Sequence, residues 1–150
     1  MPKYLIPLSA QAASYDGATH EIQILASDLT ETTDNTAQSI EIATTANSAT
    51  KSSTFQLVSV NVKEGFSGTD VSLASLNIKV GTATNGNQIS GDVQSAAAHA
   101  NTVDAKGGGT ATNATSKIAV TVGAPGAGIS LAELDKGDIR FRIKHSPDVY

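Results

Sequence analysis

Apolar and polar residues alternate along three stretches in the second half of the chain. In each stretch every second side chain is Leu, Ile, Val or Phe, and the residues between them are mostly polar. A period of two places successive side chains on opposite faces of a β-strand, so each stretch predicts a half-buried strand. The three predicted strands are Leu76–Val80, Lys117–Val122 and Asp138–Lys144.

The first half predicts four weaker strands. Pro7 in the first of them favours the edge of a sheet, where a missing N–H is tolerated. In the last of them Phe55 and Leu57 have the opposite parity from Val60 and Val62, which predicts a β-bulge or a strand covered on both faces. The four stretches are Lys3–Leu8, His20–Leu25, Gln38–Thr44 and Phe55–Lys63.

Glycine-containing turns separate these strands, and helical stretches of the length that a parallel sheet needs are missing from the pattern. About seven short strands with turns between them are typical of a sandwich or barrel. We therefore expect one all-β domain over residues 1–150, an antiparallel β-sandwich of jelly-roll type with an extended N-terminal segment at 1–15. The predicted turns are Asp16-Gly17, Gly65 with Gly68, Asn85-Gly86, and Gly123–Gly126.

One or two short helical turns and two long loops complete the prediction. Ser130–Glu133 matches the capping-box pattern and precedes the last strand. Asp92–Ala100 contains three consecutive alanines and predicts a second, marginal helical turn. Residues 44–53 and 101–116 are rich in small and polar residues, and we interpret both as long polar surface loops.

Composition narrows the function classes. The 150 residues suit one domain, and the lack of cysteine excludes a disulfide framework, a thiolate zinc site and a cysteine nucleophile. A net charge of −4 argues against binding nucleic acid through a global positive field. No apolar run is long enough for a membrane-spanning helix, and Pro7 interrupts the only N-terminal apolar patch. We expect the protein to stay in the cell that makes it, or to be assembled there into something larger.

Catalytic and cofactor motifs are missing from the sequence. The three histidines, His20, His99 and His145, have no metal-binding spacing, and we interpret them as isolated surface or strand-end residues, although a cluster formed by the fold stays open. Neither Gly-x-Ser-x-Gly nor a phosphate-binding Gly-Lys-Ser/Thr occurs, so the glycine runs predict flexible loops. The sequence therefore predicts no catalytic, cofactor-binding or metal-binding residue, and a protein that is not an enzyme.

Acidic residues leave two alternatives open. Asp28, Glu31 and Asp34 lie close together between two predicted strands, but they lack the spacing of a calcium-binding loop. A solvated acidic loop is the favoured interpretation, with calcium binding as the alternative. Carboxylates that meet only in the fold also leave a carboxylate-dependent hydrolase as a minor hypothesis.

The last predicted strand carries the clearest candidate site. Arg140, Arg142 and Lys144 share one face of that strand, in a chain of which only 16% is charged. One interpretation is a solvated outer face whose charges discourage edge-to-edge pairing. The other is a basic strip that docks on an acidic partner surface. We take these three residues as candidate partner-docking residues.

A resemblance adds a family to this interpretation. From Phe55 to Lys144 the chain resembles a divergent group of small tailed-phage virion proteins. The shared pattern is a strand ending in glycine, a polar turn and a short apolar-acidic segment, then a Thr-rich strand, a leucine-containing turn and a terminal strand. These features are Leu76–Gly81, Thr82–Asn87, Ile89–Val93, Ile118–Val122 and Leu131–Ile143.

The resemblance implies a β-sandwich that decorates or cements the phage head. Its partners would be the major capsid protein or other virion subunits, and it would act as a homo-oligomer, commonly a trimer. The protein would then be located in the virion, assembled in the host cytoplasm, with no nucleic acid or membrane partner. The alternative function is a receptor- or carbohydrate-binding module of a phage tail or fibre, using exposed loops that include residues 100–116.

Overall fold

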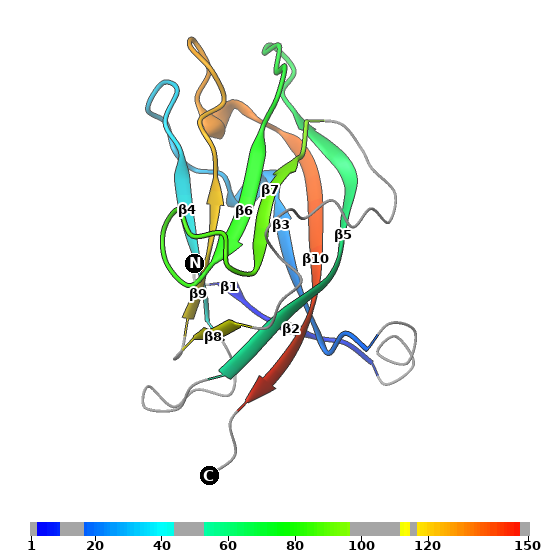
Figure 1. Cartoon of the computed structure of the whole chain (residues 1–150). Coiled ribbons are helices and arrows are strands. Elements are labelled where there is room, and N and C mark those ends of the chain that lie inside the picture. The colour runs from blue at the N-terminus through cyan, green and yellow to red at the C-terminus, as the bar shows by residue number, and fades with distance from the viewer. Residues whose placement is uncertain (1–2, 10–16, 44–52, 97–111, 115–116, 148–150) are drawn as a thin grey trace.

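The computed structural model describes residues 3–9, 17–43, 53–96, 112–114 and 117–147, which form two five-stranded sheets packed face to face (Figure 1). This confirms the predicted all-β sandwich. The sheet that we call sheet A has the order β1 (Lys3–Tyr4), β4 (Gln38–Ala43), β9 (Lys117–Val122), β6 (Asn77–Gly81) and β7 (Ser90–Gln94). Sheet B has the order β2 (Ile6–Pro7), β3 (His20–Leu25), β10 (Lys136–Pro147), β5 (Ser53–Ser67) and β8 (Thr112–Ala114).

The eight strands from β3 to β10 have the pairing of a jelly roll. β3 pairs with β10, β4 with β9, β5 with β8, and β6 with β7, and all four pairs are antiparallel. The first strand of the eight therefore pairs with the last, the second with the last but one, and so on inward. A long hairpin that is rolled up and divided between two sheets gives this order, which is the jelly-roll arrangement.

The core lies between the sheets and is made of the alternating apolar residues that predicted the strands. Phe141 at the middle of β10 and Val120 at the middle of β9 are both fully buried. Burial of one such side chain contributes about 1.5–3 kcal/mol. Other buried residues of β3, β5, β6, β9 and β10 include Ile22, Ile24, Phe55, Leu57, Val60, Val62, Phe66, Ile78, Val80, Ile118, Val122, Ile139 and Ile143.

The parity change in β5 is a β-bulge, one of the two predicted alternatives. Arg142 of β10 pairs with Ser59, but the next residue, Ile143, pairs with Leu57, so Val58 has no partner in this ladder. Leu57 stays buried on the same side as Val60 although the two differ in parity. The extra residue thus keeps apolar side chains inward along a strand of 15 residues.

Three local predictions were wrong. The turn expected at Gly65 with Gly68 begins only after Gly68, because β5 continues through Gly65 to Ser67 and Phe66 is fully buried in the core. The first part of the expected helical turn at Asp92–Ala100 is strand β7, because pairing with β6 and the burial of Val93 outweigh the local preference of alanine. The expected loop 101–116 contains strand β8, paired with the start of β5.

The described residues contain two helical turns, both of the 3-10 type. The predicted one is η2 (Leu131–Glu133), where Ser130 and Glu133 form the capping box, with Ser130 N donating to Glu133 Oε2 at 2.6 Å. The other, η1 (Ala26–Asp28), follows β3 directly and was not predicted. No helix in the described ranges is long and apolar enough to cross a membrane.

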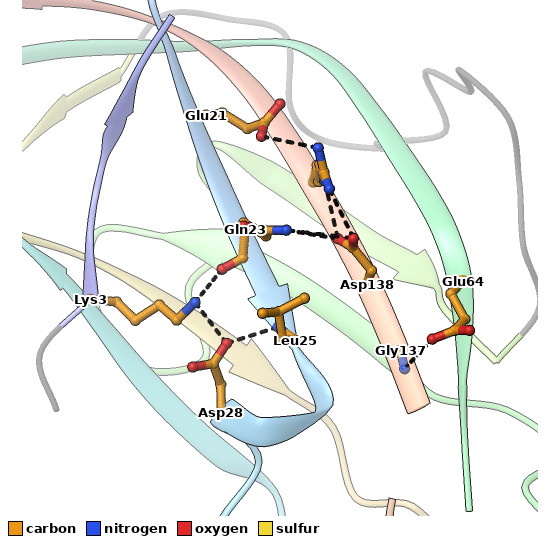
Figure 2. Close-up of polar contacts among 9 residues, drawn as sticks. Lys3, Glu21, Gln23, Leu25, Asp28, Glu64, Gly137 and Asp138 are labelled. Carbon is orange, nitrogen blue, oxygen red and sulfur yellow. Dashed lines mark hydrogen bonds and ion pairs between the residues drawn. The ribbon is translucent and has the colours of Figure 1, made fainter. Parts of the chain in front are cut away.

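The N-terminal segment joins the edges of both sheets, as Pro7 predicted for an edge strand. β1 runs parallel to β4 of sheet A, and β2 runs antiparallel to β3 of sheet B. Leu5 lies between them and is 2% exposed. Lys3 Nζ lies 2.7 Å from Asp28 Oδ2 and donates a hydrogen bond of 2.7 Å to the carbonyl of Gln23 (Figure 2). We call Lys3–Pro7 the N-terminal clasp.

We expect replacement of Lys3→Met to loosen the N-terminal clasp. The variant loses the ion pair and the hydrogen bond, which together contribute about 1 kcal/mol. Urea unfolding followed by circular dichroism should show this loss, and amide exchange in residues 4–6 should become faster. Lys63→Met, at an exposed position of β5, should stay within about 0.5 kcal/mol of the wild type. Equal effects of the two substitutions would contradict the clasp.

Candidate functional site

Part of the outer face of sheet A, around Thr121 of β9, is covered by the chain itself. The loop between β6 and β7 folds over β9, and the backbone N–H of Asn85 donates to Thr121 Oγ1 at 2.9 Å. Thr84 Oγ1 donates to Ser39 Oγ of β4 at 3.2 Å. Thr121 points away from the core, because Val120 and Val122 point into it, yet it is only 3% exposed. A partner therefore meets a loop here, not the flat surface of the sheet.

The outer face of sheet B is open. Every outward side chain that the structure describes at the centre of β3, β5 and β10 is half-buried or exposed. The three predicted docking residues lie on this face because they alternate with the buried Ile139, Phe141 and Ile143. We call this surface the open face; its central residues are Glu21, Gln23, Ser59, Asn61, Arg140, Arg142 and Lys144.

Arg140 is compensated by two carboxylates (Figure 2). Its Nη2 lies 3.0 Å from Asp138 Oδ2, and its Nε donates to Asp138 Oδ1 at 3.2 Å. Its Nη1 lies 3.9 Å from Glu21 Oε1 on the neighbouring strand β3. The hydrogen bond with Asp138 is the main reason why the pKa of Arg140 is raised. Arg140 therefore belongs to a mixed-charge network and is not a free cation.

Asp138 is the acidic centre of this network. Burial alone would raise the pKa of Asp138, but hydrogen bonds from Arg140 and Gln23, with the positive charges of Arg140 and Lys63, bring the pKa below its ordinary value. The contact from Gln23 Nε2 is long, at 3.4 Å to Oδ1. The carboxylate is therefore ionised at neutral pH and fixes the orientation of the guanidinium group.

The other two predicted residues lie further along β10. Arg142 is half-buried and pairs across the sheet with Glu21 and Ser59. Lys144 is exposed and pairs across the sheet with Gln56, an exposed and uncharged residue. Positive charge on the open face is thus concentrated toward the end of β10, while the Asp138–Arg140 part is balanced.

One interpretation of the basic strip was that its charges discourage edge-to-edge pairing, and this reason does not hold for most of the strip. Arg140 and Arg142 do not protect a sheet edge, because this part of β10 is paired with β3 on one side and with β5 on the other, whereas Lys144 lies beyond the last pair with β3. Lys and Arg discourage pairing only where a strand has a free edge. The strip therefore marks the middle of a sheet face, which is where a partner that lies flat on sheet B would make contact.

The structure brings two of the three histidines together, so the interpretation of three isolated histidines was wrong. The ring centroids of His20 and His145 are 5.3 Å apart in an edge-to-face arrangement. His145 also stacks on Phe55, with ring centroids 4.7 Å apart. His99 lies outside the described residues. Sequence spacing could not reveal the pair, because 125 positions separate two residues that meet only through the pairing of β3 with β10.

The acidic residues Asp28, Glu31 and Asp34 do not converge on one point. Asp28 accepts the backbone N–H of Leu25 and pairs with Lys3 of the N-terminal clasp. Glu31 Oε1 accepts the backbone N–H of Thr33 at 2.8 Å, and Asp34 is exposed. Within the described ranges, no three His, Cys, Asp or Glu side chains are grouped as metal ligands.

The geometry defines the class of the protein as a jelly-roll β-sandwich with one partly covered sheet face and one open, mixed-charge face. No protein-family model, curated protein or solved structure matches this chain.

We expect Asp138→Asn to destabilise the fold at neutral pH by about 1 kcal/mol, because it breaks the pair with Arg140. Since the folded-state pKa of Asp138 is lowered, its stabilisation is present above the unfolded pKa and is lost as pH falls through the folded pKa. The difference between variant and wild type should therefore shrink below about pH 4 in urea titrations from pH 7 to pH 3. Asp92→Asn, at an exposed position of β7, is the control. A difference that persists at pH 3 would contradict this role.

Proposed function

We propose that this chain is a structural protein of a tailed-phage virion, a decoration or cement protein that binds the assembled head through the open face of sheet B. The observation that supports the proposal most is the position of Lys144, which is exposed on the outer face of sheet B and has the uncharged Gln56 as its cross-strand neighbour. In a chain of net charge −4, this is a local positive surface. Its complement is an acidic surface on capsid subunits.

The open face suits weak contacts that are repeated on the regular surface of an assembled capsid. Its side chains are polar and interspersed, which is typical of an interface rim and disfavours non-specific adhesion. One such face makes a weak contact. Several copies held in one oligomer bind neighbouring capsid subunits together, and the gain in avidity arises only on an assembled shell. The proposal therefore includes a homo-oligomer, with a trimer favoured.

Ile6 of the N-terminal clasp adds apolar contact area beside the open face, and Tyr4 lies on β1 at the edge of sheet A. Tyr4 is 54% exposed and Ile6 is 41% exposed, and they are the exposed large apolar side chains of the described residues. Ile6 pairs across β2 and β3 with Glu21, so it lies at the border of the open face. Apolar anchors next to charged residues are the usual composition of protein interfaces.

The alternative function, a receptor- or carbohydrate-binding module of a tail or fibre, depends on the loop at residues 100–116. In that range the structure describes strand β8 and no other residue. The alternative therefore stays a prediction from the sequence.

The experiment that tests the proposal compares assembled and unassembled capsid protein. The purified chain is sedimented with empty shells of the major capsid protein encoded in the same genome, and is mixed separately with the unassembled subunits. We expect saturable co-sedimentation with shells and weak binding to free subunits, since avidity requires neighbouring sites. Equal affinity for both forms, or no binding to shells, would contradict the proposal.

Charge reversal on the open face tests which surface makes the contact. We expect Lys144→Glu to weaken shell binding about three- to tenfold and to reduce its dependence on salt. The matched control is Lys79→Glu, the same change on the outer face of sheet A. That variant should bind shells like the wild type. A larger effect of Lys79→Glu would place the contact on the outer face of sheet A and overturn the assignment.

The solution mass is a separate expectation. Light scattering after size exclusion should give three times the chain mass of 15.3 kDa. A monomer at all concentrations would remove the avidity argument, because a single open face would then have to bind by itself.

A further inference from the structure

Three rings from three neighbouring strands of sheet B lie side by side at one end of the sandwich. They are His20 of β3, His145 of β10 and Phe55 of β5, and the cross-strand pair His145–Phe55 is stacked with an angle of 7° between the rings. His20 meets His145 at an angle of 69°. This is the lower end in Figure 1, where β10 ends.

The ring of His145 is enclosed without full hydrogen bonding. The residue is 5% exposed, and its Nε2 atom is buried and has no hydrogen-bond partner among the described residues. An unpaired nitrogen in a buried ring is an exception that calls for a physical explanation. A neutral imidazole tolerates one unpaired nitrogen as an acceptor, whereas the protonated ring has two N–H donors that both need partners.

Thr19 connects the two histidines. Its Oγ1 accepts the backbone N–H of His145 at 2.9 Å and lies 2.8 Å from Nδ1 of His20. Its own backbone N–H donates to the carbonyl of Ile143 at 2.9 Å. One hydroxyl group therefore holds the end of β10 against the start of β3, and its hydrogen bonds depend on which atom of His20 carries the proton.

Among the described residues, no carboxylate contributes to the pKa shift of His20 or of His145. Of the charged residues next in sequence, Glu21 of β3 and Lys144 of β10 lie on the open face, on the other side of the sheet. β5 contributes Phe55, and β2 contributes Pro7, which pairs with His20. No hydrogen bond or ion pair joins either ring to a carboxylate of the described ranges. No carboxylate of the described ranges therefore compensates a proton added to either ring.

Burial and mutual repulsion act in the same direction. Burial lowers the pKa of His20, and it also lowers the pKa of His145, which the charge of His20 lowers further. The closed arrangement thus favours two neutral rings. The first proton to bind is opposed by loss of solvation and by the absence of an acceptor at Nε2, and a second proton is opposed in addition by the charge of the first.

We propose that His20 and His145 form an acid-sensitive latch: with both rings neutral this end of the sandwich is closed, and protonation of one ring separates the ends of β3, β5 and β10. This inference is independent of the virion function. The opening also reaches β8, whose partner is the segment Ser53–Phe55 of β5. The centre of the sandwich stays folded because its apolar core contains no titratable group.

The direction of the pH effect follows from linkage. A lowered folded-state pKa means that the closed end has its full stability above the ordinary histidine value of 6.5. This stability decreases as pH falls from 6.5 toward the folded-state pKa. Each unit of pKa difference between the closed and open forms changes the fraction of open molecules about tenfold.

The test is hydrogen exchange at pH 7.5 and pH 5.5, corrected for the intrinsic rates and carried out with EDTA so that no metal ion occupies the imidazoles. We expect exchange in residues 54–57 and 143–146 to increase several-fold at pH 5.5, up to a limit of about tenfold for each histidine that titrates. Residues 78–80 and 118–122, in the middle of sheet A, should change little. An increase spread over both sheets, or none, would overturn the proposal.

Single-histidine variants identify the groups that titrate. His145→Phe keeps an aromatic ring on Phe55 and should remove most of the pH response, and His20→Gln, which keeps a polar side chain beside Thr19, should reduce it. His99→Gln is the control because His99 is the third histidine of the chain and is not part of the proposed latch. Its hydrogen exchange should respond to pH like that of the wild type. If His145→Phe does not fold, the comparison of His20→Gln with His99→Gln decides the question. The latch would be overturned if the pH response of hydrogen exchange disappeared in His99→Gln and remained in His20→Gln.

Discussion

The pairing of β3 with β10 is the interaction on which the rest of the structure depends. It joins the start and the end of the rolled hairpin, and Asp138 to Ile143 meet Leu25 to His20 in an unbroken antiparallel register. β10 can then pair with β5 on its other side, and this places the bulge at Val58. The contact spans most of the chain, so the entropy of closing a long loop opposes it until the other strands are in place. Folding dominated by such non-local pairs is slow.

The same pairing explains how charge is distributed on the open face. Glu21 of β3 lies next to Arg140 and Arg142 because the register places them on the same side of the sheet. Asp138 is two residues before Arg140 on one strand, so their side chains share that side as well. Each balanced pair makes the sheet face polar without making it strongly adhesive. The positive end at Lys144 is left because its cross-strand neighbour on β5, Gln56, carries no charge.

Much of the fold could be predicted from the sequence, because the period of two in β6, β9 and β10 reflects one buried and one wet face. The order in which the strands pair could not be predicted, since it depends on contacts between segments that are distant in the sequence. β8 was missed for the same reason: Thr112–Ala114 has no apolar alternation, and pairing with the start of β5 defines it as a strand. At the site, the alternation placed Arg140 and Lys144 on one face. The Asp138–Arg140 pair could have been found from their spacing of two, whereas the contact of His20 with His145 required the register.

The antiparallel register of β3 and β10 also has a mechanical consequence. His20 at the start of β3 pairs with Ile143 near the end of β10, so the segment entering β3 and the segment leaving β10 lie at the same end of the ladder. Tension applied through these two segments would break the hydrogen bonds of the ladder one after another from this end. It would not load all of them at once, as a shearing force does. The first bonds to carry the load are those of Thr19 with Ile143 and His145. The sandwich should therefore resist a force spread over a sheet face far better than a force that pulls on the two ends of this ladder.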